Sequence, residues 1–105
     1  MAQYIIAYLG GDQPGSQEES QQYFAKYKAW LSSLGDSAVS PMNPIKNTNT
    51  INADGSVMPE STTLMSGYTI IEAASIEAAL TIAKACPFLE VNGSLEVSEL
   101  INMAD

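Results

Sequence analysis

The chain has 105 residues, of which 46% are apolar and only 15% are charged, and this composition is typical of one globular domain. Its net charge is −8, from twelve acidic residues against four basic ones, and it contains no histidine. A chain without clusters of basic residues is poorly suited to phosphate backbones or anionic lipid surfaces. We therefore expect no nucleic-acid partner and no membrane partner.

The cysteine content and the amino-terminal segment predict a cytoplasmic location. The single Cys86 cannot form an internal disulfide, which fits a reducing environment. Residues 1–11 lack the basic region and the long apolar run of a signal peptide or a membrane span. We expect one cytoplasmic domain over residues 1–105.

Residues 3–9 form an apolar run that ends at Gly10 and Gly11. Because its apolar residues do not alternate with polar ones, the run predicts a central strand that is buried on both faces. A glycine pair after a first strand also occurs in phosphate-binding loops. Neither a G-x-G-x-x-G pattern nor a following Lys-Ser/Thr pair is present, so we interpret the pair as a turn.

The next segment predicts a long amphipathic helix. Ser16 and Glu19 have the spacing of a capping box, and Gly35 supplies a carboxyl-terminal cap. One face of this helix carries its apolar and aromatic residues, which are Tyr23, Phe24, Tyr27, Trp30, Leu31 and Leu34. An aromatic stripe of this kind can form a ligand platform, but we favour its packing in the core against the sheet.

The middle of the chain predicts only short strands. Pro41 and Pro44 restrict residues 37–45 to an interrupted or edge strand. Residues 46–58 resemble a β-hairpin with Asp54 and Gly55 at its tip.

The last third of the chain predicts a strand, a helix and a second strand. Residues 68–73 are rich in β-branched and aromatic side chains, and Ser75 is the predicted helix N-cap. The apolar residues after it recur with helical spacing, and Pro87 ends the helix at the preceding residue. Asn92 and Gly93 mark a turn before a strand over residues 94–101.

This order of elements predicts an α+β, ferredoxin-like βαββαβ fold with an antiparallel sheet and two helices on one face. An extra β-hairpin lies between the second and third main strands. In so short a chain, the uncovered sheet face is most simply hidden by a second copy, so we expect a homodimer of the dimeric α/β-barrel type.

Three segments carry a resemblance to a known family: residues 67–73 (GYTIIEA), 83–90 (AKACPFLE) and 92–97 (NGSLEV). They resemble the YCII-related family, and specifically the branch named for an Asp-Gly-Pro-Phe motif. The resemblance implies a ferredoxin-like fold and dimers of the α/β-barrel type. It implies no settled activity, although a few relatives are linked to dehalogenation or lyase-like steps in aromatic breakdown.

The chain departs from the family at the positions proposed to carry chemistry. One branch is proposed to use a histidine on the first helix with an aspartate just before a Pro-Phe or Pro-Tyr pair. Here that helix has Tyr23 or Phe24 in the corresponding region, and Cys86 stands before the Pro-Phe pair. Asp54 and Gly55 of the named motif are present, but Ser-Val follows them. The chain therefore lacks the family's proposed His-Asp pair.

The absence of histidine also removes the commonest general base and the usual zinc and haem ligands, so we expect no metal and no cofactor. Cys86 falls at the negative end of a helix dipole, which raises the pKa of a thiol. We interpret it as a buried structural residue and leave any catalytic residue unassigned.

Carboxylates and tyrosines on the strands are the candidate ligand-pocket residues, namely Tyr4, Tyr8, Tyr68, Glu72 and Glu96. Glu72 and Glu96 lie on strands that could be neighbours, and a carboxylate enclosed in a dimer cleft could act as a base. The competing interpretation, which we favour, is an ordinary solvated strand face with tyrosines that pack.

The leading hypothesis is a homodimer that binds a small organic ligand without the His-Asp pair. A second hypothesis is a lyase-like or isomerase-like enzyme that uses a strand carboxylate and a tyrosine. A third is a protein-interaction module that docks a partner through the sheet edge near residues 41–52.

Overall fold

The computed structural model describes residues 1–13 and 15–103. Its elements, in chain order, are β1 (Ala2–Gly10), α1 (Gln17–Leu34), a 3₁₀ turn η1 (Gly35–Ser37), β2 (Ala38–Pro44), β3 (Thr50–Ile51), β4 (Val57–Met58), β5 (Met65–Ala73), α2 (Ile76–Lys84), a second 3₁₀ segment η2 (Pro87–Val91) and β6 (Gly93–Glu99).

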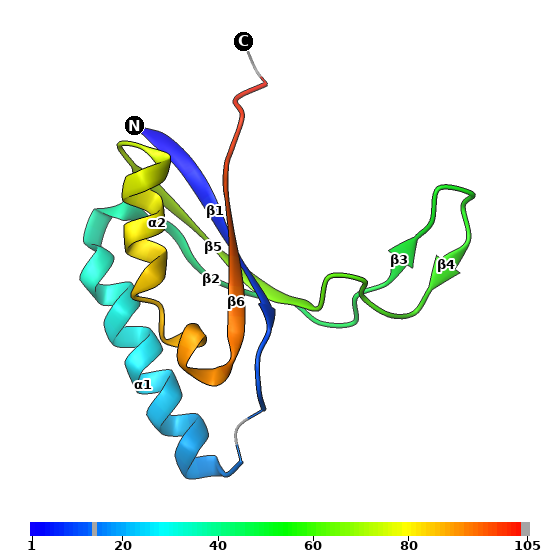
Figure 1. The fold of residues 1–105 in the computed structure, drawn as a ribbon, viewed down its shortest axis with the longest axis horizontal. Helices are drawn as coiled ribbons and strands as arrows, with labels where there is room; N and C mark the ends of the chain where they lie inside the picture. Colours follow the sequence, from blue (N-terminus) through cyan, green and yellow to red (C-terminus); the bar gives the residue numbers. More distant parts are fainter. Residues whose placement is uncertain (14, 104–105) are drawn as a thin grey trace.

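The main sheet has four strands in the order β2-β5-β1-β6, and every neighbouring pair is antiparallel. Both helices lie on the same side of this sheet (Figure 1). The ferredoxin-like α+β prediction is confirmed, including the extra hairpin β3-β4 between the second and third main strands. The predicted strand and helix boundaries hold to within two residues at most ends.

The central strand β1 does not have the environment that was predicted for it. Its buried positions alternate, with Tyr4, Ile6 and Tyr8 buried beneath the helices and Ile5 and the other intervening residues only partly covered. The expectation of burial on both faces is therefore wrong for a single chain, because no element covers the second face within the described residues. Apolar side chains on that second face explain the unbroken apolar run.

Both helices begin at the predicted serine caps. The Ser16 hydroxyl accepts the Glu19 backbone N–H at 3.1 Å, and the Ser75 hydroxyl accepts the Ala78 N–H at 3.1 Å. The capping box is displaced by one residue, because the Glu19 carboxylate accepts the N–H of Gly15 at 2.7 Å.

The hairpin β3-β4 projects from the sheet as an arm (Figure 1). Ile51 and Val57 on it are 73% and 62% exposed. The arm and the extended carboxyl terminus give a Cα radius of gyration of 15.2 Å, against about 13 Å for a compact domain of this size. Among the described residues, no helix is both long and apolar enough to cross a membrane.

Trp30 joins the two helices. Its indole Nε1–H donates to the backbone carbonyl of Ile82 at 3.2 Å, and its ring is buried in the core. Trp30→Phe should lower the free energy of unfolding by about 1–2 kcal/mol, because the hydrogen bond is lost while most of the ring packing is kept. Trp30→Ala should cost about 3–5 kcal/mol, since it also leaves a cavity.

Urea denaturation followed by far-UV circular dichroism measures both variants without needing the tryptophan signal. Equal losses in the two variants would show that the hydrogen bond, rather than the ring, holds the helices. An unchanged urea midpoint in both variants would contradict the role of Trp30 in joining the two helices.

Candidate functional site

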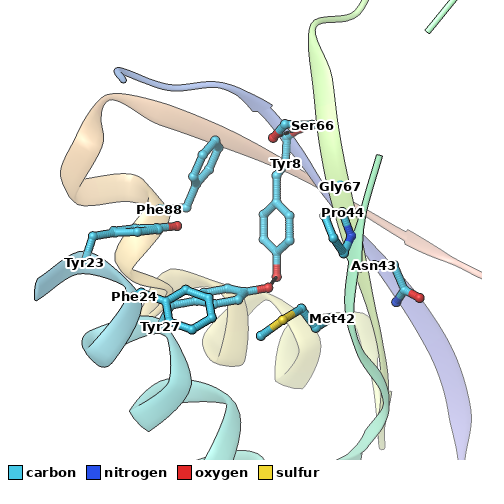
Figure 2. A pocket seen from close by; sticks show the side chains of 10 residues that line it. All are labelled: Tyr8, Tyr23, Phe24, Tyr27, Met42, Asn43, Pro44, Ser66, Gly67 and Phe88. Atoms are coloured by element: carbon cyan, nitrogen blue, oxygen red, sulfur yellow. Dashed lines mark hydrogen bonds between the residues drawn. The ribbon is translucent and has the colours of Figure 1, made fainter. Parts of the chain in front are cut away.

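A pocket of about 280 Å³ opens between α1, the β2–β5 edge of the sheet and η2. Its wall is largely aromatic and is formed by Tyr8, Tyr23, Phe24, Tyr27, Met42, Asn43, Pro44, Ser66, Gly67 and Phe88. Figure 2 shows the rings of the tyrosines and Phe88 around the space, with Met42 turned toward Tyr27 and the Asn43 side chain turned away. No basic side chain lines the pocket among the described residues.

Two residues of the wall, Tyr8 and Tyr27, join Thr69 behind it in a chain of three buried hydroxyls, which we call the hydroxyl floor. The Tyr8 hydroxyl lies 2.9 Å from that of Tyr27 and is also hydrogen-bonded to the Thr69 hydroxyl. Thr69 in turn donates to the backbone carbonyl of Pro41 at 2.7 Å. Strand β1, helix α1 and strand β5 each contribute one hydroxyl, so the chain ties three elements together at one point.

The two pocket tyrosines with shifted pKa values are held in the protonated form. Burial raises the pKa of Tyr8 well above its usual value. Burial also raises the pKa of Tyr23 to about 12, with smaller contributions from Cys86 and Tyr27. Neither residue is a base at neutral pH, so their hydroxyls can bind and orient a ligand but do not remove its proton.

Phe88 forms one wall because two glycines leave room for its ring. A Cβ atom on Gly93 would lie 2.2 Å from the Phe88 ring, and one on Gly11 would lie 2.8 Å from it. The ring also packs against Tyr8, with centroids 5.4 Å apart. The turn Asn92-Gly93 therefore does more than reverse the chain, since its glycine fixes the position of a pocket wall.

A second hollow, of about 500 Å³, adjoins this pocket and shares Tyr23, Phe24 and Phe88 with it. Its remaining wall is polar and carries the carboxylates of Asp12, Glu19 and Glu90. The approach to the aromatic pocket from this side is therefore negatively charged, although the Lys26 ammonium lies 3.1 Å from Glu90.

Of the five candidate residues named from the sequence, Tyr8 lies in the pocket wall. Tyr4 is on the same buried face of β1, but four residues along a strand separate the two by about 13 Å. Burial and the charges of Glu99 and Glu77 raise the pKa of the Tyr4 hydroxyl. Tyr4 is a core residue next to α2.

The other three candidates are on the opposite, open face of the sheet. Tyr68 and Glu96 both pair with Ala7, one from each side, so their Cα atoms are about 10 Å apart. Glu72 pairs with Gln3, four residues further along β1. The expectation that the strands of Glu72 and Glu96 are neighbours is wrong, because β1 lies between β5 and β6.

The sequence did contain a signal for the pocket in the aromatic stripe of α1. Tyr27 and Trp30 are buried, as the core interpretation predicted, whereas Tyr23 is half-buried and Phe24 is 43% exposed. The same stripe therefore packs in the core at one end and lines the pocket at the other. Stacking of Tyr23 on Tyr27, with centroids 6.1 Å apart, marks the transition.

Cys86 lies just after α2 and is 2% exposed. Burial raises the pKa of its thiol to about 11, with a smaller opposing contribution from the backbone N–H of Phe88. A thiol of this kind is a poor nucleophile at neutral pH, in agreement with its interpretation as a structural residue. The described residues contain no group of three side chains that could hold a metal ion.

Comparison with known proteins agrees with the fold. No curated protein sequence matches the chain significantly. Among solved structures, 5-chloro-2-hydroxyhydroquinone dehydrochlorinase (TftG) from Burkholderia phenoliruptrix AC1100, in complex with 2,5-dihydroxybenzoquinone, is similar over 95% of this chain and 94% of its own, with a TM-score of 0.60. Its sequence is 19% identical, so the likeness shows a shared fold. The YCII-related domain matches residues 4–104, and the chain belongs to this family.

Proposed function

We propose that the protein is a homodimer that binds a small aromatic molecule in the pocket between α1 and the sheet. The observation that carries this proposal is the aromatic, apolar wall, in which the hydroxyls of Tyr8 and Tyr27 are hydrogen-bonded to each other. A cavity of about 150 Å³ lined by apolar side chains is enough to bind benzene. The volume here, about 280 Å³, accommodates one ring with substituents.

The chemistry of the wall supports binding rather than catalysis. The chain has no histidine, the pocket tyrosines with shifted pKa values stay protonated, and the nearby thiol of Cys86 is buried. A ligand can stack on the rings of Tyr23 and Phe24 and reach the hydroxyl floor. The similar structure that was solved in complex with 2,5-dihydroxybenzoquinone has the same fold, which is compatible with a ring-shaped ligand here.

In the proposed homodimer, the second copy packs against the open face of the sheet. This face carries partly covered apolar side chains such as Ile5, Leu9 and Ile70, beside Tyr68. A contiguous apolar patch on the surface of a soluble protein often marks an interaction site. Pairing the face with its own copy about a two-fold axis would bury it.

An enzymatic role is the second candidate, because Tyr68 and Glu96 flank Ala7 on the face that a dimer would enclose. Enclosure disfavours the charged form of a carboxylate and makes it a stronger base. If the protein turns over a ligand by this route, Glu96→Gln should abolish turnover while Glu72→Gln, placed further along the sheet, keeps most of it. Equal turnover rates in Glu96→Gln and the parent protein would rule out this enzymatic role.

The pocket is tested with a panel of monocyclic compounds, namely phenol, acetophenone and benzoate, by ligand-observed NMR and titration calorimetry. We expect at least one of them to bind, and Gly93→Ala to weaken that binding about tenfold. The added methyl forces the Phe88 ring from its place, at a cost of about 1–3 kcal/mol.

Ser94→Ala is the matched control, because Ser94 is exposed and adjoins Gly93 in the sequence. It should leave both affinity and stability unchanged. Failure of the whole panel to bind the folded protein would refute the proposed function, and unaltered binding by Gly93→Ala would place the ligand elsewhere.

The dimer is tested by sedimentation equilibrium. The parent protein should sediment as a dimer and Ile70→Asp as a monomer, because the new carboxylate would be buried opposite its copy. Leu80→Asp makes a comparable change on α2, where Leu80 is 42% exposed, and should stay dimeric. A monomeric parent protein at high concentration would contradict the homodimer.

A further inference from the structure

The hydrogen bonds of the hydroxyl floor commit every one of its hydroxyl protons. Thr69 has a single hydroxyl proton and donates it to the Pro41 carbonyl, which can only accept. The hydrogen bond between Tyr8 and Thr69 must then use the proton of Tyr8. The bond between Tyr27 and Tyr8, at 2.9 Å, must in turn use the proton of Tyr27. The Tyr27 hydroxyl also lies 3.5 Å from that of Thr69, and a bond there would use the same proton. The chain therefore runs from Tyr27 through Tyr8 and Thr69 to Pro41.

This direction leaves the floor with acceptors and no donor. All three hydroxyl protons are committed, whereas the oxygens of Tyr27 and Tyr8 keep free lone pairs. The Asn43 amide is also committed, because its Nδ2 group donates to Ser40 and to the Tyr68 carbonyl. The Ser66 hydroxyl donates to the backbone carbonyl of Tyr8 at 3.5 Å. The half-buried Tyr23 hydroxyl is a donor elsewhere in the wall.

The charges around the pocket also disfavour an anionic ligand. No basic side chain lines the pocket among the described residues, although the Lys28 ammonium lies 4.9 Å from the centroid of the Phe24 ring. The adjoining hollow carries Asp12, Glu19 and Glu90, of which Glu90 is paired with Lys26. An anionic ligand would lose its hydration without gaining a cation or a donor at the floor. A neutral ligand that donates a hydrogen bond faces neither cost.

We propose that the pocket selects neutral aromatic molecules that carry a hydroxyl group, with the ligand O–H donating to the Tyr27 or Tyr8 oxygen. Phenols and hydroquinones belong to this class, whereas aryl ketones and quinones without a hydroxyl group, and aryl carboxylates, do not. This inference rests on the proposed function, since it specifies the ligand of the same pocket.

The ranking of the three panel compounds tests the inference. Phenol should bind about three- to tenfold more tightly than acetophenone, because only phenol has an O–H group that can donate to the free lone pairs of the hydroxyl floor. Benzoate should bind more weakly than both at neutral pH. If acetophenone or benzoate binds as tightly as phenol, this inference is wrong while the proposed function stands. If none of the three binds, the proposed function itself falls.

Thr69→Val is the sharpest variant, because it removes the end of the hydroxyl chain with almost no change in shape. Tyr8 and Tyr27 then hold two protons but use one between them, so one O–H is freed for a ligand carbonyl. The ratio of phenol to acetophenone affinity should fall to about one or lower. Thr69→Ser keeps the hydroxyl and should keep the parent ratio. An unchanged ratio in folded Thr69→Val overturns the inference.

Tyr27→Phe keeps the test decisive if Thr69→Val fails to fold. In this variant Tyr8 still donates to Thr69, and its oxygen gains a second free lone pair. The floor stays without a donor, so phenol should still bind more tightly than acetophenone. A preference for acetophenone in Tyr27→Phe would show that the Tyr8 proton points into the pocket and would overturn the inference.

Discussion

The alternation of side chains along β1 is the constraint on which the rest of the structure depends. Antiparallel pairing with β5 on one side and β6 on the other fixes the register of this strand and therefore the face of each residue. Tyr8 is directed under the helices, where it meets Tyr27 and Thr69. Its neighbour Ala7 is directed to the open face, between Tyr68 and Glu96. A slip of one residue would exchange the two sets.

The two faces consequently have different tasks. The covered face holds an aromatic pocket backed by a chain of hydroxyls whose protons are all donated, and the described residues contain no buried side-chain polar atom without a partner. The open face has apolar side chains without a cover and carboxylates at its sides. In the proposed dimer, the first face serves a ligand and the second joins the copies, so binding and assembly use separate surfaces.

Local patterns predicted the elements well because each was signalled by nearby residues. Ser16 and Ser75 cap the helices, Pro87 follows the end of α2, and the Asp54-Gly55 turn closes the hairpin. The strand environment was mispredicted because an apolar run has the same appearance whether its second face meets a helix or another molecule. The composition of the run does not distinguish burial under a helix from burial against another molecule.

The site was less accessible to sequence reasoning, because it depends on contacts between distant segments. The meeting of Tyr8 with Tyr27 and Thr69 spans separations of 19 and 61 residues, which no local period records. Glu72 and Glu96 were paired by their chemistry, but the strand order places β1 between them. The support of Phe88 by Gly93 is likewise invisible until the chain is folded.

The central claim is that an aromatic ligand lies on the helix-covered face and not on the open one. Intermolecular nuclear Overhauser effects between phenol and the protein's aromatic protons test it most directly. The structure predicts effects to the rings of Tyr27 and Phe88 and none to the ring of Tyr68. Effects to Tyr68 alone would place the ligand on the open face and contradict the account.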